Sequence, residues 1–232
     1  MKTTQGGTVR RITDRCFQLD HSRGANGYVV VGEGRAAVID PGLASGFAKL
    51  LRELRDSESQ TGPITDIVLT HYDPDHSGAA ARLQRELDVP VWIGAADAEI
   101  LSGEKEAPSG ARRFMSALSR VKNPAGVREL TAPAGEPHHE SEVFPGLTVI
   151  PTPGHTPGHV ALQWGPVLFV GDAVSVSKDG ALRQFSMGPL IADKTLAMAS
   201  EAVLNERIAA TDVEWVCAGH NPPARVIRAL AP

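Results

Sequence analysis

The sequence contains very little cysteine. Only Cys16 and Cys217 occur among 232 residues, so at most one disulfide can form and a disulfide framework is excluded. Two buried thiols in a reducing compartment are the favoured interpretation of this pair, and a single disulfide is the alternative.

Long apolar runs and an excess of positive charge are also missing. No stretch approaches the ~20 apolar residues that span a bilayer, and the N-terminal MKTTQGGTVRRITD lacks the apolar segment of a signal peptide. The formal net charge is −4, and Lys and Arg occur only singly or in short pairs such as Arg112-Arg113. We therefore expect a soluble, cytoplasmic protein that has neither a membrane nor a nucleic acid as partner.

What the sequence does contain is typical of a globular α/β chain. Hydrophobic residues make up 42% and charged residues 22%, and 232 residues can bury a substantial core. Periodicity predicts strands at 9–19, 27–32, 35–39, 64–69, 89–93, 147–150, 160–164, 167–170 and 213–217, and helices at 45–55, 79–87, 95–101 and 193–207. Both halves follow the order strands, polar loop, helix, strand. We expect one domain over residues 1–232, with a two-layer sheet core and helices outside.

Four metal-binding types of side chain crowd together after the buried strand 64–69. His71, Asp73, Asp75 and His76 lie within six residues. Imidazoles and carboxylates are common ligands of divalent metals. Because Pro74 interrupts regular helix or strand, we expect a turn in which these side chains converge.

Three further candidates follow other strands. His155 comes after the strand 147–150, Asp172 after 167–170 and His220 after 213–217. Each alone is more often a turn or capping residue than a ligand. Four strand ends that each deliver a ligand type, however, predict one metal site if those strands share a sheet edge.

The motifs THYDPDHSG, TPGHTPGH, FVGDA, CAGHNPP and the upstream VIDPG resemble the metallo-β-lactamase superfamily, glyoxalase II-like branch, over roughly residues 25–223. The resemblance implies a four-layer αββα sandwich with two metals between its sheets. The implied roles are His71 and His155 on the first metal, Asp75, His76 and His220 on the second, Asp172 as the bridge, and Asp40 and His159 as supports behind the ligands.

Asp73 departs from the family pattern H-x-H-x-D-H, which has histidine at this position. The favoured interpretation is a carboxylate ligand of the first metal. The alternatives are a supporting residue with water in the ligand position, or a weak or empty first site. If Asp73 is a ligand, the four negative charges of three carboxylates and a hydroxide balance the four positive charges of two divalent ions. Zinc is the favoured ion. A site of zero net charge would suit iron or manganese better than a first position with only histidine nitrogens as ligands would.

The resemblance implies a dinuclear metal-dependent hydrolase. A metal-bound hydroxide, oriented by Asp75, would attack an ester, thioester, lactone or related carbonyl of a small-molecule substrate. The main alternative is an iron-dependent redox or oxygen-handling protein, because flavodiiron proteins carry a carboxylate at the position of Asp73. A nuclease and a degenerate metal-binding protein are weaker alternatives, and a homodimer stays open.

Two segments are candidates for substrate contact. The stretch 102–123 has the composition of an insertion or lid, and 175–191 carries Arg183, Phe185 and Met187 between glycines. Tyr72 lies between two ligand candidates and contacts either substrate or the core. Asp97 is interpreted as an ordinary charge of the helix 95–101.

Overall fold

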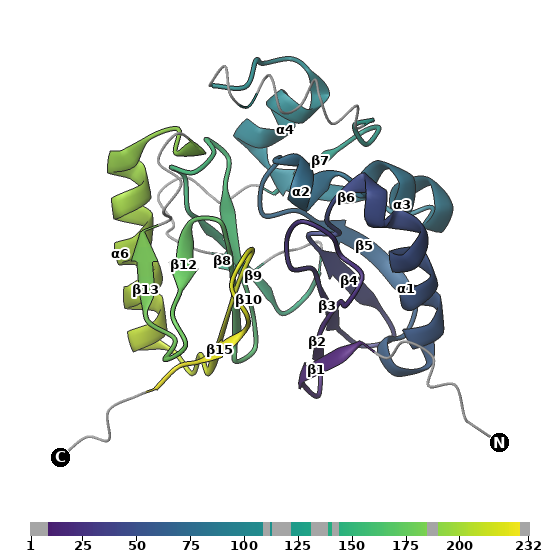
Figure 1. Ribbon diagram of the computed structural model, residues 1–232, viewed down its shortest axis with the longest axis horizontal. Helices are drawn as coiled ribbons and strands as arrows, with labels where there is room; N and C mark the ends of the chain where they lie inside the picture. Colours follow the sequence, from purple (N-terminus) through teal and green to yellow (C-terminus); the bar gives the residue numbers. More distant parts are fainter. Residues whose placement is uncertain are drawn as a thin grey trace.

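The computed structural model describes residues 9–108, 112, 122–130, 139–140, 144–184 and 190–227. Two sheets face one another, and helices cover their outer faces (Figure 1). The predicted four-layer αββα sandwich of the α/β class is therefore confirmed. The assignment of residues 1–232 to one domain stays a prediction.

The first sheet has the strand order β1-β2-β3-β4-β5-β6-β7. Its strands are β1 (Arg10–Thr13), β2 (Cys16–Gln18), β3 (Tyr28–Val31), β4 (Ala36–Ile39), β5 (Ile64–Val68), β6 (Val91–Gly94) and β7 (Arg128–Leu130). Pairing is antiparallel from β1 to β4 and parallel from β4 to β7. The single strand predicted over 9–19 is wrong, because a turn at Asp14-Arg15 folds it into the β1–β2 hairpin.

The second sheet has the order β15-β14-β11-β10-β9-β8. Its strands are β8 (His139–Glu140), β9 (Leu147–Pro151), β10 (Val160–Trp164), β11 (Val167–Gly171), β14 (Trp215–Ala218) and β15 (Ala224–Arg225). A separate hairpin pairs β12 (Val174–Val176) with β13 (Leu182–Gln184). Strand β10 runs antiparallel to both β9 and β11, and β11 is parallel to β14. Strands β9, β11 and β14 therefore all end at one edge.

The helices include α1 (Phe47–Thr61), α2 (Pro74–Ser77), α3 (Ala80–Leu87), α4 (Ala95–Ser102) and α6 (Lys194–Ala210), with a 3-10 turn at Ala44–Gly46. The expectation that Pro74 prevents regular structure is wrong. Proline occupies the first turn of α2, where its missing N–H costs no hydrogen bond. Among the described helices, none combines the length and the apolarity that a bilayer crossing requires.

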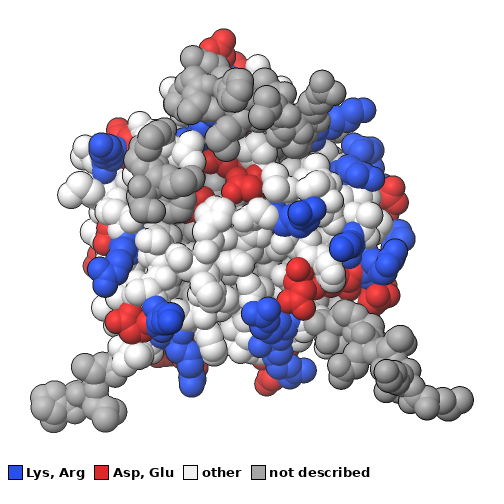
Figure 2. Space-filling view, viewed as in Figure 1, with Lys and Arg blue, Asp and Glu red and all other residues white. Residues whose placement is uncertain are grey.

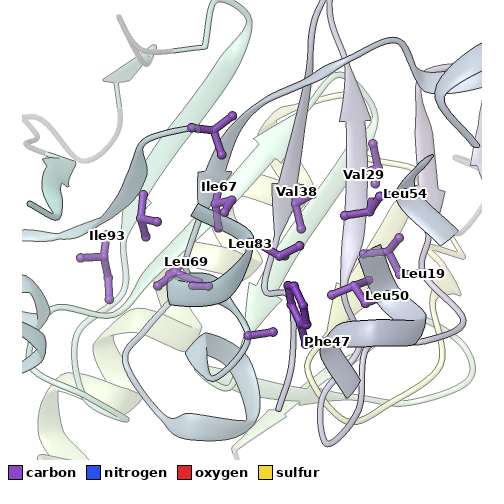
Figure 3. Packing of buried hydrophobic residues seen from close by; sticks show 14 of the residues in the cluster. Leu19, Val29, Val38, Phe47, Leu50, Leu54, Ile67, Leu69, Leu83 and Ile93 are labelled. Atoms are coloured by element: carbon purple, nitrogen blue, oxygen red, sulfur yellow. The ribbon is translucent and has the colours of Figure 1, made fainter. Parts of the chain in front are cut away.

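Three apolar clusters hold the layers together. One packs α1 and α3 against the first sheet, with Phe47, Leu50 and Leu83 facing Val38 and Ile67 (Figure 3). A second lies between the two sheets, and a third lies between the second sheet and α6. The between-sheet cluster contains Cys16 and Cys217 as free, buried thiols, which confirms the thiol interpretation over the disulfide.

Backbone hydrogen bonds join the two sheets at the edge where the strands end. The amide of Val160, at the start of β10, donates to the carbonyl of Thr70 just after β5 at 2.9 Å. The amide of Asn26 donates to the carbonyl of Gly219 just after β14 at 2.7 Å. These bonds hold the segment after β5 beside the start of β10, and the segment after β14 beside the loop before β3.

Close backbone approach at this edge requires a glycine. A Cβ on Gly94, at the end of β6, would overlap the carbonyl oxygen of Gly158 in the TPGHTPGH segment. We predict that Gly94→Ala loses about 3 kcal/mol of unfolding free energy, because the backbone must move apart. Gly34→Ala is the control: Gly34 has φ +66° and open space, so only the conformational cost of about 1 kcal/mol remains. Equal losses in urea denaturation would contradict this close approach.

Candidate metal centre

Four of the predicted ligands converge on one point, called here the second position. Asp75 and His76 come from α2, Asp172 follows β11 and His220 follows β14. The Nε2 of His76 lies 3.4 Å from Asp172 Oδ1 and 4.0 Å from Asp75 Oδ2. The Nε2 of His220 lies 3.3 Å from Asp75 Oδ2 and 3.2 Å from Asp172 Oδ2.

Asp40 holds His76 from behind. The Nδ1 of His76 lies 2.8 Å from Asp40 Oδ2, so Nδ1 carries a proton toward Asp40 and Nε2 faces the second position. The same carboxylate accepts from the amide of Thr70 at 2.8 Å and from its hydroxyl at 2.7 Å. Asp40 thus lies where the sequence predicts a supporting residue, and it adopts φ 50°, a conformation that aspartate tolerates better than most residues.

Three buried atoms at the centre have no hydrogen-bond partner among the described residues: His71 Nε2, His76 Nε2 and Asp172 Oδ1. Unpaired buried polar atoms are rare because each costs free energy. A divalent ion would satisfy His76 Nε2 and Asp172 Oδ1 together. The ligand atoms of Asp75, His76 and His220 form one group with metal-binding spacing, and those of His71, His76 and Asp172 form another. The residues of the second position therefore fit a metal.

The charges at the second position are strongly coupled. Burial alone would lower the pKa of His76, but the carboxylates of Asp172 and Asp40 raise it well above its ordinary value. Hydrogen bonds that His220 donates to the carboxylates of Asp172 and Asp75 raise its pKa to about 9. Burial would raise the pKa of Asp172, yet the neighbouring His76 and His220 hold it well below its ordinary value. The carboxylates around the second position thus make it favourable for a cation.

His71, Asp73 and His155 form a neighbouring group, called here the first position. Asp73 Oδ2 lies 3.6 Å from His71 Nε2 and 3.1 Å from His155 Nε2. Asp172 Oδ2 lies 3.7 Å from His155 Nε2, so Asp172 stands between the two positions, where the sequence predicts the bridge. All four side chains are buried.

A guanidinium occupies the middle of the first position. Arg112 donates from Nε to Asp73 Oδ1 and from Nη2 to Asp73 Oδ2, both at 2.9 Å. Its Nη1 donates to the carbonyl of His155 at 2.8 Å, and its Nη2 lies 3.0 Å from His155 Nε2. With Arg112 there, the carboxylate of Asp73 and the Nε2 of His155 already contact a cation, and of the three ligand side chains only His71 has a ligand atom, Nε2, that Arg112 does not contact. The ligand atoms of His71, Asp73 and His155 lie close enough together to hold a metal, but with the guanidinium among them the first position does not fit one.

Asp73 and Arg112 form a buried, charged pair. Burial would raise the pKa of Asp73, but hydrogen bonds from His155, His71 and Arg112 and the charge of His71 hold it well below its ordinary value. Burial would lower the pKa of Arg112, but Asp73 raises it. Sequence reasoning missed Arg112, which it treated as one of several scattered charges. The available signal was Asp73 itself, because an extra buried carboxylate requires a cation.

Asp97 is wrongly interpreted from the sequence as an ordinary helix charge. It is fully buried near the start of α4 and accepts three hydrogen bonds: from the amide of Tyr72 at 3.2 Å, the hydroxyl of Thr156 at 2.7 Å and the amide of Gly158 at 2.6 Å. Asp97 therefore ties the His71–Asp73 segment to the segment that carries His155. Position and spacing alone gave no sign that this side chain turns inward.

His159 has a similar supporting place. Its Nε2 accepts from the amide of Asp172 at 3.2 Å, so its Nδ1 carries the proton toward the Thr152 hydroxyl at 2.8 Å. Burial lowers the pKa of His159 well below its ordinary value, which keeps the ring neutral. It lies behind the ligand candidates, as the sequence predicts.

Of the four predicted substrate residues, the structure describes Tyr72 and Arg183. Tyr72 is buried in the cluster between the first sheet and its helices, which favours the packing alternative. Arg183 is exposed on β13, and its substrate role stays a prediction. Phe185 and Met187 lie outside the described residues.

The centre opens to solvent at the second position. The side chains of His220 and Asp75 are 35% and 28% exposed, whereas those of Asp73, His76 and Asp172 are at most 5% exposed. Figure 2 shows acidic side chains exposed in the upper middle of this face, between the two halves of the molecule. A substrate would therefore approach past Asp75 and His220.

The buried carboxyl of Asp97 should make the stability of the folded protein depend on pH. Burial raises its pKa to about 6, above the ordinary value of 3.8, so the folded state binds the extra proton. The stabilisation that this bound proton provides is complete below the ordinary pKa of 3.8 and is lost as pH rises through about 6.

Asp97→Asn cannot titrate, so the unfolding free energy of the wild type relative to this variant should fall by roughly 1 kcal/mol between pH 5 and 7. Urea denaturation at both pH values measures it. Glu99→Gln is the control, because this side chain of the same helix is 41% exposed. A pH-independent difference for Asp97→Asn would contradict the prediction.

Curated relatives match parts of the chain. A probable metallo-hydrolase YflN of Bacillus subtilis (strain 168) is 28% identical over 149 residues, which cover 59% of this chain and 54% of the relative. A hydroxyacylglutathione hydrolase of Cupriavidus taiwanensis is 31% identical over 175 residues, which cover 70% of this chain and 54% of the relative. The chain thus spans about half the length of these two relatives.

Solved structures match nearly all of the fold. TTHA1623 in a di-iron-bound form is 30% identical, with a TM-score of 0.62 over 87% of this chain and 89% of that one. The B3 metallo-beta-lactamase BLEG-1 is 23% identical, with a TM-score of 0.60 over 90% and 93% of the two chains, and shows the shared fold.

A family model described as the metallo-beta-lactamase superfamily matches residues 23–220, which include the candidate ligands from His71 to His220. Together with the αββα fold and the side chains gathered between its sheets, this match means that the chain belongs to the metallo-β-lactamase superfamily.

Proposed function

We propose that the protein is a metal-dependent hydrolase whose divalent ion is held by Asp75, His76, Asp172 and His220. The observation that carries the proposal is the unpaired state of His76 Nε2 and Asp172 Oδ1, which are buried beside Asp75 and His220. Two imidazoles and two carboxylates suit zinc, iron or manganese. Such an ion supplies Lewis acidity to a substrate carbonyl and to water.

Asp75 is the proposed catalytic carboxylate. It lies on the open side of the centre, with its side chain 28% exposed and Oδ2 3.3 Å from His220 Nε2. Burial would raise its pKa, but His220, His76 and His71 keep the pKa below its ordinary value. Asp75 is therefore an ionised acceptor at neutral pH, able to orient a water molecule toward a substrate that enters past His220.

The proposed substrates are small molecules with an ester, thioester, lactone or related carbonyl. The name of the Cupriavidus taiwanensis relative, a hydroxyacylglutathione hydrolase, supports a thioester as the first compound to test. The exposed places of Asp75 and His220 support attack on a carbonyl that reaches the centre from solvent, while the buried Asp40 and His159 keep the ligands in place.

Hydrolysis of a panel of thioesters, lactones, phosphodiesters and β-lactams tests the proposal. We expect turnover of at least one carbonyl substrate that is lost with chelator and regained with metal. Asp75→Asn should lower kcat/KM at least ~100-fold, because it removes the ionised acceptor. Asp88→Asn, an exposed carboxylate at the end of α3, should leave it unchanged. Metal-loaded protein without turnover on any compound would contradict the hydrolase.

Iron-dependent redox chemistry is the second candidate function. It is favoured by the 30% identity to TTHA1623, whose structure is described as di-iron-bound, and by the two carboxylates of the second position. Metal analysis of protein purified without added metal separates the candidates. Stoichiometric zinc with no iron would contradict the redox function, whereas bound iron with metal-dependent oxygen consumption would support it.

A further inference from the structure

We propose that the guanidinium of Arg112 takes the place of the first metal, so that the chain holds one divalent ion, at the second position. The inference rests on the proposed function, which places a metal at the second position. It adds that a guanidinium, in place of a second metal, lies beside that ion. In place of a two-metal centre, the site would contain one exchangeable ion and one permanent cation that belongs to the chain.

Arg112 contacts two of the three ligands that a first metal would need, Asp73 and His155. Both carboxylate oxygens of Asp73 accept from the guanidinium at 2.9 Å, and His155 Nε2 lies 3.0 Å from Nη2. A metal bound to Asp73 Oδ2 and His155 Nε2 would have to share these atoms with the guanidinium. Two cations on the same lone pairs repel each other strongly in a buried site.

The arginine is held as a built-in part of the site. Its side chain is 1% exposed, and it is among the largest fully buried side chains of the described residues. Its Nη1 also donates to the carbonyl of His155 at 2.8 Å, which fixes the guanidinium plane across the first position. The planar guanidinium matches the carboxylate of Asp73 with two parallel N–H···O hydrogen bonds.

This pairing explains why aspartate stands at residue 73. A histidine there would place a third imidazole against the guanidinium and leave the buried cation without a negative partner. The aspartate supplies that partner, and breaking one half of a buried ion pair is strongly destabilising. Asp73 and Arg112 therefore form one ion pair, in which Asp73 binds the guanidinium of the chain in place of a metal ion.

Formal charge agrees with one ion. Asp73 faces the guanidinium, and Asp75 and Asp172 face the second position, so three carboxylates lie between the two positions. Arg112 and one divalent ion together carry three positive charges, which gives a neutral centre. Two divalent ions and Arg112 would carry five, and this excess is costly in a buried site.

A guanidinium changes what the first position can do. It is fully protonated at any physiological pH, and it offers hydrogen-bond donors where a metal offers open coordination positions. Arg112 can hold Asp73 and His155 in place and contributes a positive charge beside the second position, but it cannot lower the pKa of a bound water as a metal ion does. It is thus a positioning residue that acts through its two neighbours.

Metal stoichiometry tests the inference without reference to activity. The full-length protein is stripped with chelator, reloaded with Zn²⁺ or Mn²⁺, and measured by calorimetric titration and by elemental analysis after desalting. We expect about one ion per chain for the wild type. Arg112→Met removes the charge at similar length, so it should bind about two ions. Arg85→Met, an exposed arginine on α3, is the matched control and should bind one.

The double variant Arg112→Met/Asp73→His guards against misfolding of the single variant. It removes both halves of the ion pair together, leaves no unpaired buried charge and should also bind two ions. Two ions per wild-type chain, or one ion in a folded double variant, would overturn the inference and leave the hydrolase proposal standing. No ion bound to the wild type would overturn both.

Discussion

The centre depends on how its buried carboxylates are neutralised. Asp73, Asp75 and Asp172 each lie within 4.0 Å of at least one imidazole in this largely buried centre, where isolated charges are costly. Two solutions lie side by side. Arg112 neutralises Asp73 with two parallel hydrogen bonds, whereas Asp75 and Asp172 converge with His76 and His220 on a point that fits a metal.

The fold serves this centre by joining two separate sheets at one edge. Strand β5 delivers the segment that contains His71, and β9, β11 and β14 deliver the segments that contain His155, Asp172 and His220. Buried acceptors set these segments relative to one another: Asp40 joins Thr70 to His76, and Asp97 joins the segment after β5 to that after β9. Both carboxylates are themselves fully bonded, so they can stay ordered with or without a bound ion.

Much of this could be predicted from the sequence, because the ligand types stand directly after hydrophobic strands. Strand periodicity predicts a two-layer sheet core with helices outside. The resemblance of the motifs to the metallo-β-lactamase superfamily implies the αββα sandwich and the convergence of His71, His76, His155, Asp172 and His220. Arg112 and Asp97 could not be found in this way. Each lies in a segment without a motif, and only the three-dimensional packing turns its charge inward to a specific partner.

The departure at Asp73 shows why a motif alone is insufficient. As a ligand type it predicts a two-metal site, but in the fold its oxygens are directed at an arginine 39 residues further along the chain. A crystal structure of the metal-loaded protein with anomalous scattering tests this most directly. The account predicts one anomalous peak, among Asp75, His76, Asp172 and His220, with the guanidinium of Arg112 between Asp73 and His155. A second peak bound by Asp73 and His155, with Arg112 displaced, would contradict it.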